Sequence, residues 1–449
     1  MTQLLFASVA DDDTGASDLA GMLAEQGLRV ILAIDLPTEE KLKSWARNHE
    51  AVIIATATRA IQPEEARSRT REAVRLLASL KPRQIQFKYC STFDSTVHGN
   101  IGPSIDAALE ESGETFTVAI PALPVNGRTT YNGYHFVHHE LLSDSPMRDH
   151  PLNPMRNPNL VTHLGQQTRR KVGLADYKAV NAGPEALQSR LRELKTAGVE
   201  IAVLDCLDNT HLLTICESIA GIRLITGSSS PGIGLPAVWR RLGWWRPETS
   251  ATENAEGRSE AGCLFVAGSC SVATRGQNRW LRNQGVEYFE IDPRQLLEGH
   301  PSEQEAVASK IAAELGQGSG VLITTSSEPA DIERTQRWAA EAGRSPQQIG
   351  LEIARALACF CRRILARQQP AGLILAGGET SSAMCRELQF GALRVGANIE
   401  PGVPLCRALE GFPIPVVLKS GNFGSEDFYG RAERAIRGGR SRNYTGHNG

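Results

Sequence analysis

The sequence predicts an α/β protein with two domains, each built on a mostly parallel β-sheet flanked by helices. Three observations carry this prediction. The chain has 449 residues, more than one ordinary hydrophobic core accommodates. Short apolar runs alternate with longer amphipathic runs in both halves, the pattern of strands alternating with helices. The composition changes after Trp245, where a polar stretch containing Pro and Gly separates the two halves.

The first half alternates expected strands with expected helices. The strands are Leu4–Ala10, Arg29–Ile34, Val52–Thr56, Gln84–Lys88, Phe116–Ile120, Glu200–Leu204 and Ile222–Thr226. The helices are Ala16–Gln26, Pro63–Leu80, Pro103–Glu111, Pro184–Ala197 and Asn209–Ile219. Because open parallel sheets bind ligands beyond the carboxyl ends of their strands, the residues that follow each strand are the first candidates for a site.

The second half repeats the alternation after a predicted linker, 246–262, so the expected domains are 1–245 and 263–437, with a flexible tail at 438–449. Its strands are Cys263–Ala267, Val286–Ile291, Val321–Thr324, Gly372–Ala376 and Ile414–Lys419. Its helices are Ala273–Gln284, Ser302–Leu315 and a long helix from Gln347. The apolar stripe of the long helix is predicted to be core: Ile349, Ile353, Leu357, Phe360 and Ile364.

Charge and hydropathy argue against several classes of partner. The chain has 48 basic and 50 acidic residues, a formal net charge of −2, and therefore no general field that attracts nucleic acid. The Arg-rich end, 431–442, is mixed with Gly and Ser and is expected to be a solvated tail. No apolar run approaches the roughly 20 residues of a membrane span. The opening lacks the basic start and long apolar stretch of a secretory signal.

The cysteines and histidines give no metal signature. The nine cysteines are scattered without a C-x-x-C pair, which favours a reducing cytoplasm over disulfides or zinc. His135, His138 and His139 lack companion ligands at zinc spacing. We therefore expect these histidines to be structural, and we predict no protein-bound metal site.

An acidic turn, ADDDTGASD at 10–18, follows the first expected strand and opens a helix. N-capping explains one such side chain, and each carboxylate near the helix start gains about 0.3–1 kcal/mol from the macrodipole. Capping needs one residue rather than four acidic ones, so a functional role is favoured. A carboxylate at this point accepts a proton from a substrate hydroxyl or binds the hydroxyl directly.

A second polar segment, Lys88–Pro103, leaves a strand and enters a helix. An ordinary connection is the plain alternative, but the segment exceeds the usual two to six residues, which favours a binding loop. Arg59 follows the neighbouring strand and is expected at the same edge of the sheet. Arg59 and Lys88 suit a substrate carboxylate, although a solvated surface Arg is the default for Arg59 taken alone.

In the second half, three segments of small and hydroxyl residues follow apolar strands: Gly268–Thr274, Gly377–Ser382 and Lys419–Gly424. Glycine lets a phosphate approach the backbone, and a helix N-terminus supplies aligned N–H donors. One Gly-Gly turn is weak support, whereas three such segments in one domain favour nucleotide phosphates. Neither a Walker A pattern nor Gly-x-Gly-x-x-Gly after the first strand is present, which disfavours a P-loop ATPase and a dinucleotide enzyme.

Taken together, these segments and Pro121–Thr129 resemble the four-carbon acid sugar kinase family. The runs KYCSTFDSTVHGNIGP, PALPVNGRTTYNGYHFV, MRDHPLNPMRNPNL and LKSGNFGSEDF are most similar to its 3-oxo-tetronate kinase branch. The resemblance spans roughly Leu4 to Tyr429, and several long motifs in the same order are specific.

The resemblance implies an N-terminal domain for the sugar acid, a C-terminal domain for ATP, and an active site in the cleft between them. Substrate contacts are expected from Asp11, Asp12, Arg59, Lys88, Ser91, Asp94 and Ser95, with Asp12 or Asp11 catalytic. ATP contacts are expected from Ser269, Ser271, Gly377, Gly378, Glu379, Thr380 and Gly421. The implied reaction transfers the γ-phosphate of ATP, carried with Mg²⁺, to the terminal C4 hydroxyl of a 3-oxo-tetronate. Closure about 246–262 is expected to exclude water.

Two positions depart from the wider family, which tends to have Leu where Asp13 stands and Arg where His98 stands. The departure at His98 favours the oxo-acid branch over threonate or erythronate kinases, the nearest alternative. More distant alternatives are a non-enzymatic sugar-acid-binding protein and an NAD-dependent oxidoreductase. The catalytic base stays open among Asp11, Asp12 and Asp94. A homodimer is expected without a sequence signal for it.

Overall fold

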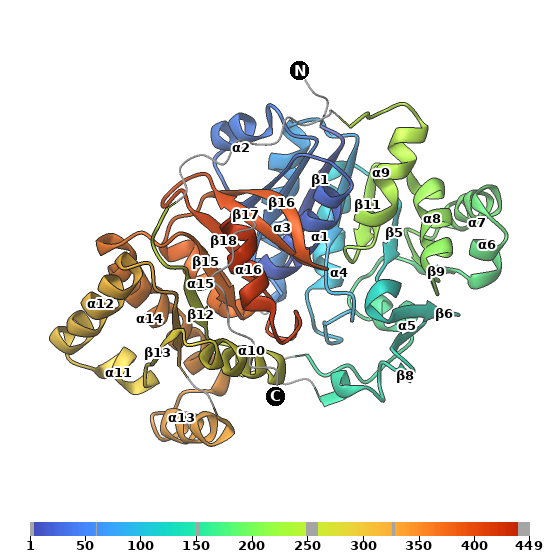
Figure 1. Cartoon of the computed structure of the whole chain (residues 1–449). Coiled ribbons are helices and arrows are strands. Elements are labelled where there is room, and N and C mark those ends of the chain that lie inside the picture. Colours follow the sequence, from blue (N-terminus) through green and yellow to red (C-terminus); the bar gives the residue numbers. More distant parts are fainter. Residues whose placement is uncertain (1–3, 60, 150–152, 248–258, 326–327, 439–449) are drawn as a thin grey trace, which may run out of the picture. The chain divides into compact units, whose positions relative to one another are not determined.

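The computed structural model describes residues 4–59, 61–149, 153–247, 259–325 and 328–438 (Figure 1). Contacts divide the chain into two compact units, Met1–Thr249 and Ser250–Gly449. The division falls inside the linker expected at 246–262, of which 248–258 lies outside the described residues. Most of the expected tail, 439–449, also lies outside them. Nowhere in the described ranges is a helix both long and apolar enough to cross a bilayer.

The first unit has one parallel sheet whose strand order is β2-β3-β1-β4-β11-β5-β10-β9. Its strands are β1 (Phe6–Ala10), β2 (Val30–Ile34), β3 (Ala51–Ala55), β4 (Gln84–Lys88), β5 (Thr117–Ile120), β9 (Val172–Ala175), β10 (Ile201–Leu204) and β11 (Leu224–Gly227). The central strands are buried along their whole length, as strands covered by helices on both faces must be.

Helices cover both faces of this sheet. They are α1 (Asp13–Glu25), α2 (Glu39–Ala46), α3 (Pro63–Ser79), α4 (Ile101–Ser112), α5 (Leu160–Gly165), α6 (Tyr177–Asn181), α7 (Pro184–Thr196), α8 (Asn209–Ile219) and α9 (Pro231–Arg241). On one face Ala7, Val9 and Phe87 share a core with α3 and α4. On the other face Phe6 packs against Trp239 of α9, with ring centroids 5.8 Å apart. The alternation along β1 therefore places α3–α4 and α9 on opposite faces.

A small antiparallel sheet departs from the expected pattern. It contains β6 (Arg128–Tyr131), β7 (Tyr134–Val137) and β8 (Glu140–Leu141). The turn between β6 and β7 is Asn132-Gly133, and both residues have positive φ, 48° and 77°. Asn-Gly is the preferred pair for such a two-residue hairpin, so this signal was present in the sequence.

The second unit has a mixed sheet in the order β13-β14-β12-β15-β18-β17-β16. Its strands are β12 (Leu264–Ala267), β13 (Glu287–Glu290), β14 (Val321–Thr324), β15 (Leu373–Ala376), β16 (Ala392–Glu400), β17 (Val403–Ala408) and β18 (Pro415–Lys419). From β13 to β18 the pairs are parallel, and β17 runs antiparallel to both its neighbours. The helices are α10 (Val272–Asn283), α11 (Pro293–Glu298), α12 (Pro301–Gly316), α13 (Pro329–Glu341), α14 (Pro346–Arg367), α15 (Gly378–Glu387) and α16 (Phe428–Ile436).

The predicted class is confirmed: both units are α/β, with mostly parallel sheets flanked by helices. Every expected strand is present within a few residues of its predicted bounds. The hairpin of β16 and β17, the outer strand β9 and helix α9 were not expected. They extend the sheets or pack beside them.

Candidate functional site

Three strand ends meet at one edge of the first sheet. Ala10 at the end of β1 is in register with Ala55 of β3 and with Lys88 of β4. Backbone hydrogen bonds between these segments continue beyond the strand ends. The N–H of Asp11 donates to Lys88 O at 3.0 Å, and the N–H of Thr58 donates to Asp11 O at 2.8 Å. The acidic turn and the two basic residues predicted from the sequence therefore lie together, as expected.

Arg59 binds the two aspartates of the turn. Its Nε and Nη2 donate to the two carboxylate oxygens of Asp11 at 2.9 Å each, and Nη2 also donates to Asp12 Oδ1 at 2.7 Å. This two-point contact is the strong geometry of an Arg–carboxylate pair. The fork of Arg59 is thus occupied by protein carboxylates, and its direct contact with a substrate stays a prediction.

Asp12 is also the N-cap of α1, where its carboxylate accepts from Gly15 N at 3.0 Å and from Thr14 Oγ1 at 2.8 Å. Burial disfavours its ionised form, but the charges of Arg59 and Lys88 outweigh burial and lower the pKa of Asp12. For Asp11 burial dominates and raises the pKa, against the effect of Arg59. The capping and functional interpretations therefore coexist, since capping accounts for Asp12 and leaves Asp11 unexplained.

Lys88 is buried among the carboxylates of Asp11, Asp12 and Asp18 and forms an ion pair with Asp12. Its side chain is 4% exposed, and Nζ lies 3.8 Å from Asp12 Oδ1, too far for a hydrogen bond. No hydrogen bond joins Nζ to any part of the chain that the structure describes. A methyl group on Gly15 would lie 1.9 Å from this Nζ and 2.3 Å from Asp12 Oδ1. The glycine of the turn therefore makes the room that Lys88 fills.

Two further residues belong to this cluster: Asp18, the last residue of the predicted acidic turn, to which no individual role was assigned, and Ser229 at the turn from β11 into α9, which was missed from the sequence. Ser229 Oγ donates to Asp18 Oδ2 at 2.5 Å, while Asp18 Oδ1 is buried without a partner among the described residues. Burial raises the pKa of Asp18 against the opposing charge of Lys88. The signal was available, because Ser228-Ser229-Ser230 follows a strand in the same way as the other candidate segments.

The loop after β4 is held by two buried histidines. His135 Nε2 lies 2.8 Å from Ser91 O, and His163 Nε2 lies 2.7 Å from Ser95 O, so both rings donate to loop carbonyls. Burial lowers the pKa of both histidines, to about 4 for His135, which keeps the rings neutral. Asp94 lies in the same loop and is buried. These contacts fix the backbone of the loop, and substrate contacts by Ser91, Asp94 and Ser95 stay predictions.

His135, the first residue of the histidine cluster, is buried and held by the protein. Thr130 Oγ1 lies 3.0 Å from His135 Nδ1, so both ring nitrogens of His135 are engaged by the protein. No group of three or more His, Cys, Asp or Glu side chains is arranged to hold a metal ion among the described residues.

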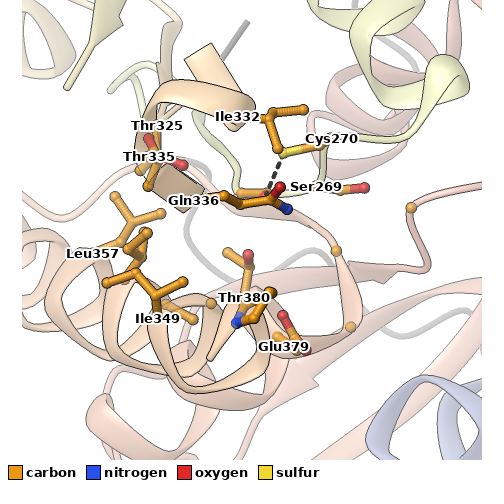
Figure 2. A pocket seen from close by; sticks show the side chains of 18 residues that line it. Ser269, Cys270, Thr325, Ile332, Thr335, Gln336, Ile349, Leu357, Glu379 and Thr380 are labelled. Atoms are coloured by element: carbon orange, nitrogen blue, oxygen red, sulfur yellow. Dashed lines mark hydrogen bonds between the residues drawn. The ribbon is translucent and has the colours of Figure 1, made fainter. Parts of the chain in front are cut away.

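The second unit contains a cavity of about 440 Å³ (Figure 2). The three predicted glycine segments all contribute to its wall, through Gly268–Cys270, Gly377–Thr380 and Gly421. Of the residues predicted to bind ATP, Ser269, Gly377, Gly378, Glu379, Thr380 and Gly421 line the cavity. Ser271 does not line it; instead it caps α10 by accepting from Thr274 N at 3.2 Å.

The polar end of the cavity suits an anion. Helix α15 begins at Gly378, so the backbone N–H groups of its first turn lie at the wall of the cavity. Gly421 approaches Ser269 so closely that a methyl group on it would lie 2.3 Å from Ser269 Oγ. Glu379 is the acidic residue of this wall, and burial raises its pKa.

The apolar residues that line the cavity qualify one prediction. Ile349, Ile353 and Leu357 of α14 line the cavity together with Ile332 of α13, as Figure 2 shows for Ile332, Ile349 and Leu357. The prediction that the stripe of α14 is core holds for Ile349 and Leu357, which are buried although they line the cavity, and it fails only at Ile353, which is partly buried. The prediction also holds for Phe360 and Ile364, which are buried. An apolar slot beside clustered N–H donors is suited to a flat base that carries phosphates.

These features define a class: a two-part α/β enzyme with a strand-end cluster of carboxylates and cations in one unit and an anion-binding, partly apolar cavity in the other. Residues 6–233 match the family model of a sugar-binding N-terminal domain, and residues 264–429 match that of a nucleotide-binding C-terminal domain. The chain therefore belongs to the four-carbon acid sugar kinase family, and it is a kinase that transfers phosphate to a hydroxyl group.

Relatives agree over nearly the full length. A 3-oxo-tetronate kinase of Pseudomonas fluorescens is 40% identical over 441 residues, covering 97% of this chain and 98% of that protein. A 3-oxo-tetronate kinase of Cupriavidus necator is 40% identical over 438 residues, with the same coverage. A solved structure from Haemophilus influenzae is 36% identical, has a TM-score of 0.77, and is matched over 96% of this chain and 100% of that one.

Proposed function

We propose that this protein transfers the γ-phosphate of ATP to the terminal C4 hydroxyl of a four-carbon sugar acid, 3-oxo-tetronate, giving the 4-phosphate. The observation that carries the proposal is the cavity of the second unit, where three strand-end segments far apart in sequence line one space. The choice of acid is supported by the names of the full-length relatives.

In the first unit, Lys88 is the group best suited to the carboxylate of the substrate. A buried ammonium without a hydrogen-bond acceptor gains most from an anion that supplies one. Asp11, Asp12 and Arg59 lie beside it and offer oxygens and a guanidinium to the remaining hydroxyl and oxo groups. Ser91, Asp94 and Ser95 complete the proposed contacts from the loop after β4.

Asp12 is proposed to position the attacking hydroxyl. Phosphoryl transfer needs in-line placement and charge stabilisation more than a strong base. The charges of Arg59 and Lys88 keep Asp12 ionised, and an ionised carboxylate accepts the hydroxyl proton as the bond to phosphorus forms.

In the second unit, the base of ATP is proposed to lie on the apolar wall of α14. The phosphates then face the N–H groups near Gly378, Glu379 and Thr380, with Ser269 and Gly421 beside them and Ser271 holding the start of α10. Mg²⁺ enters as part of the substrate, bound to the phosphate oxygens. Glu379 is the carboxylate of the cavity wall that suits it.

A substrate screen tests the proposal. Release of ADP is measured with 3-oxo-tetronate, threonate and erythronate, each in both enantiomeric forms, and phosphorus NMR locates the phosphate on the product. We expect turnover with a 3-oxo-tetronate and a phosphate on C4. Preferred turnover of threonate or erythronate would replace the substrate but keep the reaction class. No turnover of any four-carbon acid, together with no ATP binding, would favour a non-enzymatic sugar-acid-binding protein.

A further inference from the structure

The last parallel strand of the second unit ends in a buried ammonium. Lys419 closes β18 and is fully buried. Its Nζ donates to Thr274 Oγ1 at 3.1 Å and to the carbonyl oxygens of Ser420, Gly421 and Phe423 at 3.0, 3.1 and 3.1 Å. The loop 420–424 therefore wraps around this one positive charge.

Neighbouring side chains turn further carbonyls of the loop to the same side. Gly421 O also accepts from Ser271 Oγ at 2.5 Å and from Thr274 Oγ1 at 2.8 Å. Gln277 Nε2 donates to the carbonyls of Phe423, Gly424 and Ser425 at 3.0, 2.9 and 2.9 Å. Almost every carbonyl from 420 to 425 is thus bound on the protein side of the loop.

The planar trans peptide then sets the direction of the N–H groups. In each peptide unit the N–H points away from the C=O, so carbonyls turned inward leave the N–H groups of Gly421, Asn422 and Gly424 turned outward. None of these three N–H groups donates a hydrogen bond to any described residue. Gly421 itself lines the cavity. At Gly421 the loop therefore presents a backbone donor at the wall of the space assigned to the nucleotide, and the N–H groups of Asn422 and Gly424 follow in the same loop.

We propose that Lys419 is a positioning residue for phosphate binding: an internal cation that orders the loop 420–424 and aims its backbone N–H groups at the phosphates of the nucleotide. The inference rests on the proposed function, because those phosphates are the groups that receive the donors. Lys419 acts through the loop and does not itself contact the nucleotide.

The test compares nucleotide with nucleoside. Isothermal titration with ATP, ADP and adenosine is carried out on the wild type and on Lys419→Met, which keeps the length of the side chain and removes the charge. We expect the affinity for ATP to fall by about tenfold or more, as for a lost hydrogen-bonded charge, and the affinity for adenosine to stay unchanged. Lys310→Met, an exposed lysine of α12 in the same unit, is the matched control and should bind all three ligands as the wild type does.

Equal losses for ATP and adenosine would show a merely structural role and overturn the inference, as would no loss. A wild type that binds adenosine and ATP equally well would also overturn it. Should Lys419→Met fail to fold, Thr274→Val removes the hydroxyl shared by Nζ and Gly421 O at nearly constant volume. This variant should lose affinity several-fold for ATP alone, and an equal effect on adenosine would again overturn the inference. A wild type that turns over no sugar acid but binds ATP selectively would reject the proposed function and leave the inference standing.

Discussion

Asp12 has two structural contacts and one proposed catalytic role, and a single substitution can test the catalytic role separately. It caps α1, pairs with Arg59 and is proposed to position the attacking hydroxyl. Asn at an N-cap is about as favourable as Asp, so Asp12→Asn should fold. We expect kcat to fall by about 10²–10⁴, the usual contribution of a general base, with thermal unfolding close to that of the wild type. Steady-state kinetics and circular dichroism measure the two quantities. Turnover near that of the wild type would move the role to Asp11 or Asp94.

Gly15 is predicted to matter through the space that it leaves. Because a methyl group there would overlap Lys88 Nζ, Gly15→Ala should displace the ammonium and raise KM for the sugar acid, while KM for ATP stays constant. Gly276→Ala is the matched control, since Gly276 also lies in a helix and nothing lies within 4 Å of the added methyl group. If both variants behave alike in the kinetic assay, the proposed role of Lys88 in substrate binding loses its support.

Lys419 gives the reaction a predicted alkaline limit. Burial lowers the pKa of Lys419 from 10.5 to about 8, against the opposing effect of Glu400. As pH rises through about 8 the folded protein loses this proton, so affinity for ATP should fall while affinity for adenosine does not. Between about pH 8 and 10.5 the unfolded chain still holds the proton that the folded chain has released. The contribution of this lysine to the free energy of unfolding therefore rises with pH over that interval. Titrations with ATP and adenosine from pH 7 to 9.5 distinguish a loss of phosphate binding from a loss of the fold. An ATP affinity that does not change with pH contradicts the prediction.

At the scale of elements, α14 divides into two functional halves. Ile349, Ile353 and Leu357 line the cavity, whereas Ile364 is buried and does not line it. Ile353→Ala should weaken ATP binding with a small effect on stability, because Ile353 is only partly buried. Ile364→Ala should cost about 2–5 kcal/mol of unfolding free energy and leave KM for ATP unchanged. Chemical denaturation and ATP kinetics on the two variants measure both effects. The reverse pattern would mean that the base does not bind on this helix.

Elements with clear local signals were predicted well. Strand β4 and helix α8 have their predicted bounds, because the alternating residues of β4 and the amphipathic stretch of α8 each carry a clear periodicity. The hairpin of β16 and β17 was missed, since its alternation is interrupted by Gly396 and by register shifts. The hairpin of β6 and β7 was missed despite its Asn-Gly turn.

The candidate site was predictable where it follows directly from a strand end. Asp11, Asp12, Arg59 and Lys88 were expected together and lie together, because parallel strands bring their carboxyl ends to one edge. Asp18 lies in the acidic turn that the sequence singles out, but the contact that it makes could not be predicted in this way. It sits in an amphipathic helix, and its partner Ser229 is 211 positions away in sequence. The contribution of α14 to the cavity wall was not predicted, because a core stripe and the lining of a cavity have the same spacing of apolar residues in the sequence.

At the scale of the whole molecule, the site in the cleft and the closure about 246–262 stay predictions. A kinase that excludes water should become more compact when both substrates bind. We expect the radius of gyration from small-angle scattering to fall when a non-hydrolysable ATP analogue and the sugar acid are added together, and to change less with either alone. The same measurement gives the mass, and the expected homodimer requires twice the 48.6 kDa of one chain. An unchanged radius with both ligands would contradict closure.

The two neutral histidines under the loop after β4 carry a consequence of their own. The unfolded state takes up a proton on each histidine near pH 6.5, but folded His135 resists protonation down to about pH 4. Over that interval the unfolded state binds more protons, so the free energy of unfolding falls as the pH falls from 6.5. Each ring donates a hydrogen bond to the carbonyl of a serine next to the proposed sugar-acid site. As the pH falls, binding of the sugar acid should therefore weaken before binding of ATP does. The two units would then fail at opposite ends of the pH scale, the sugar side in acid and the nucleotide side in alkali.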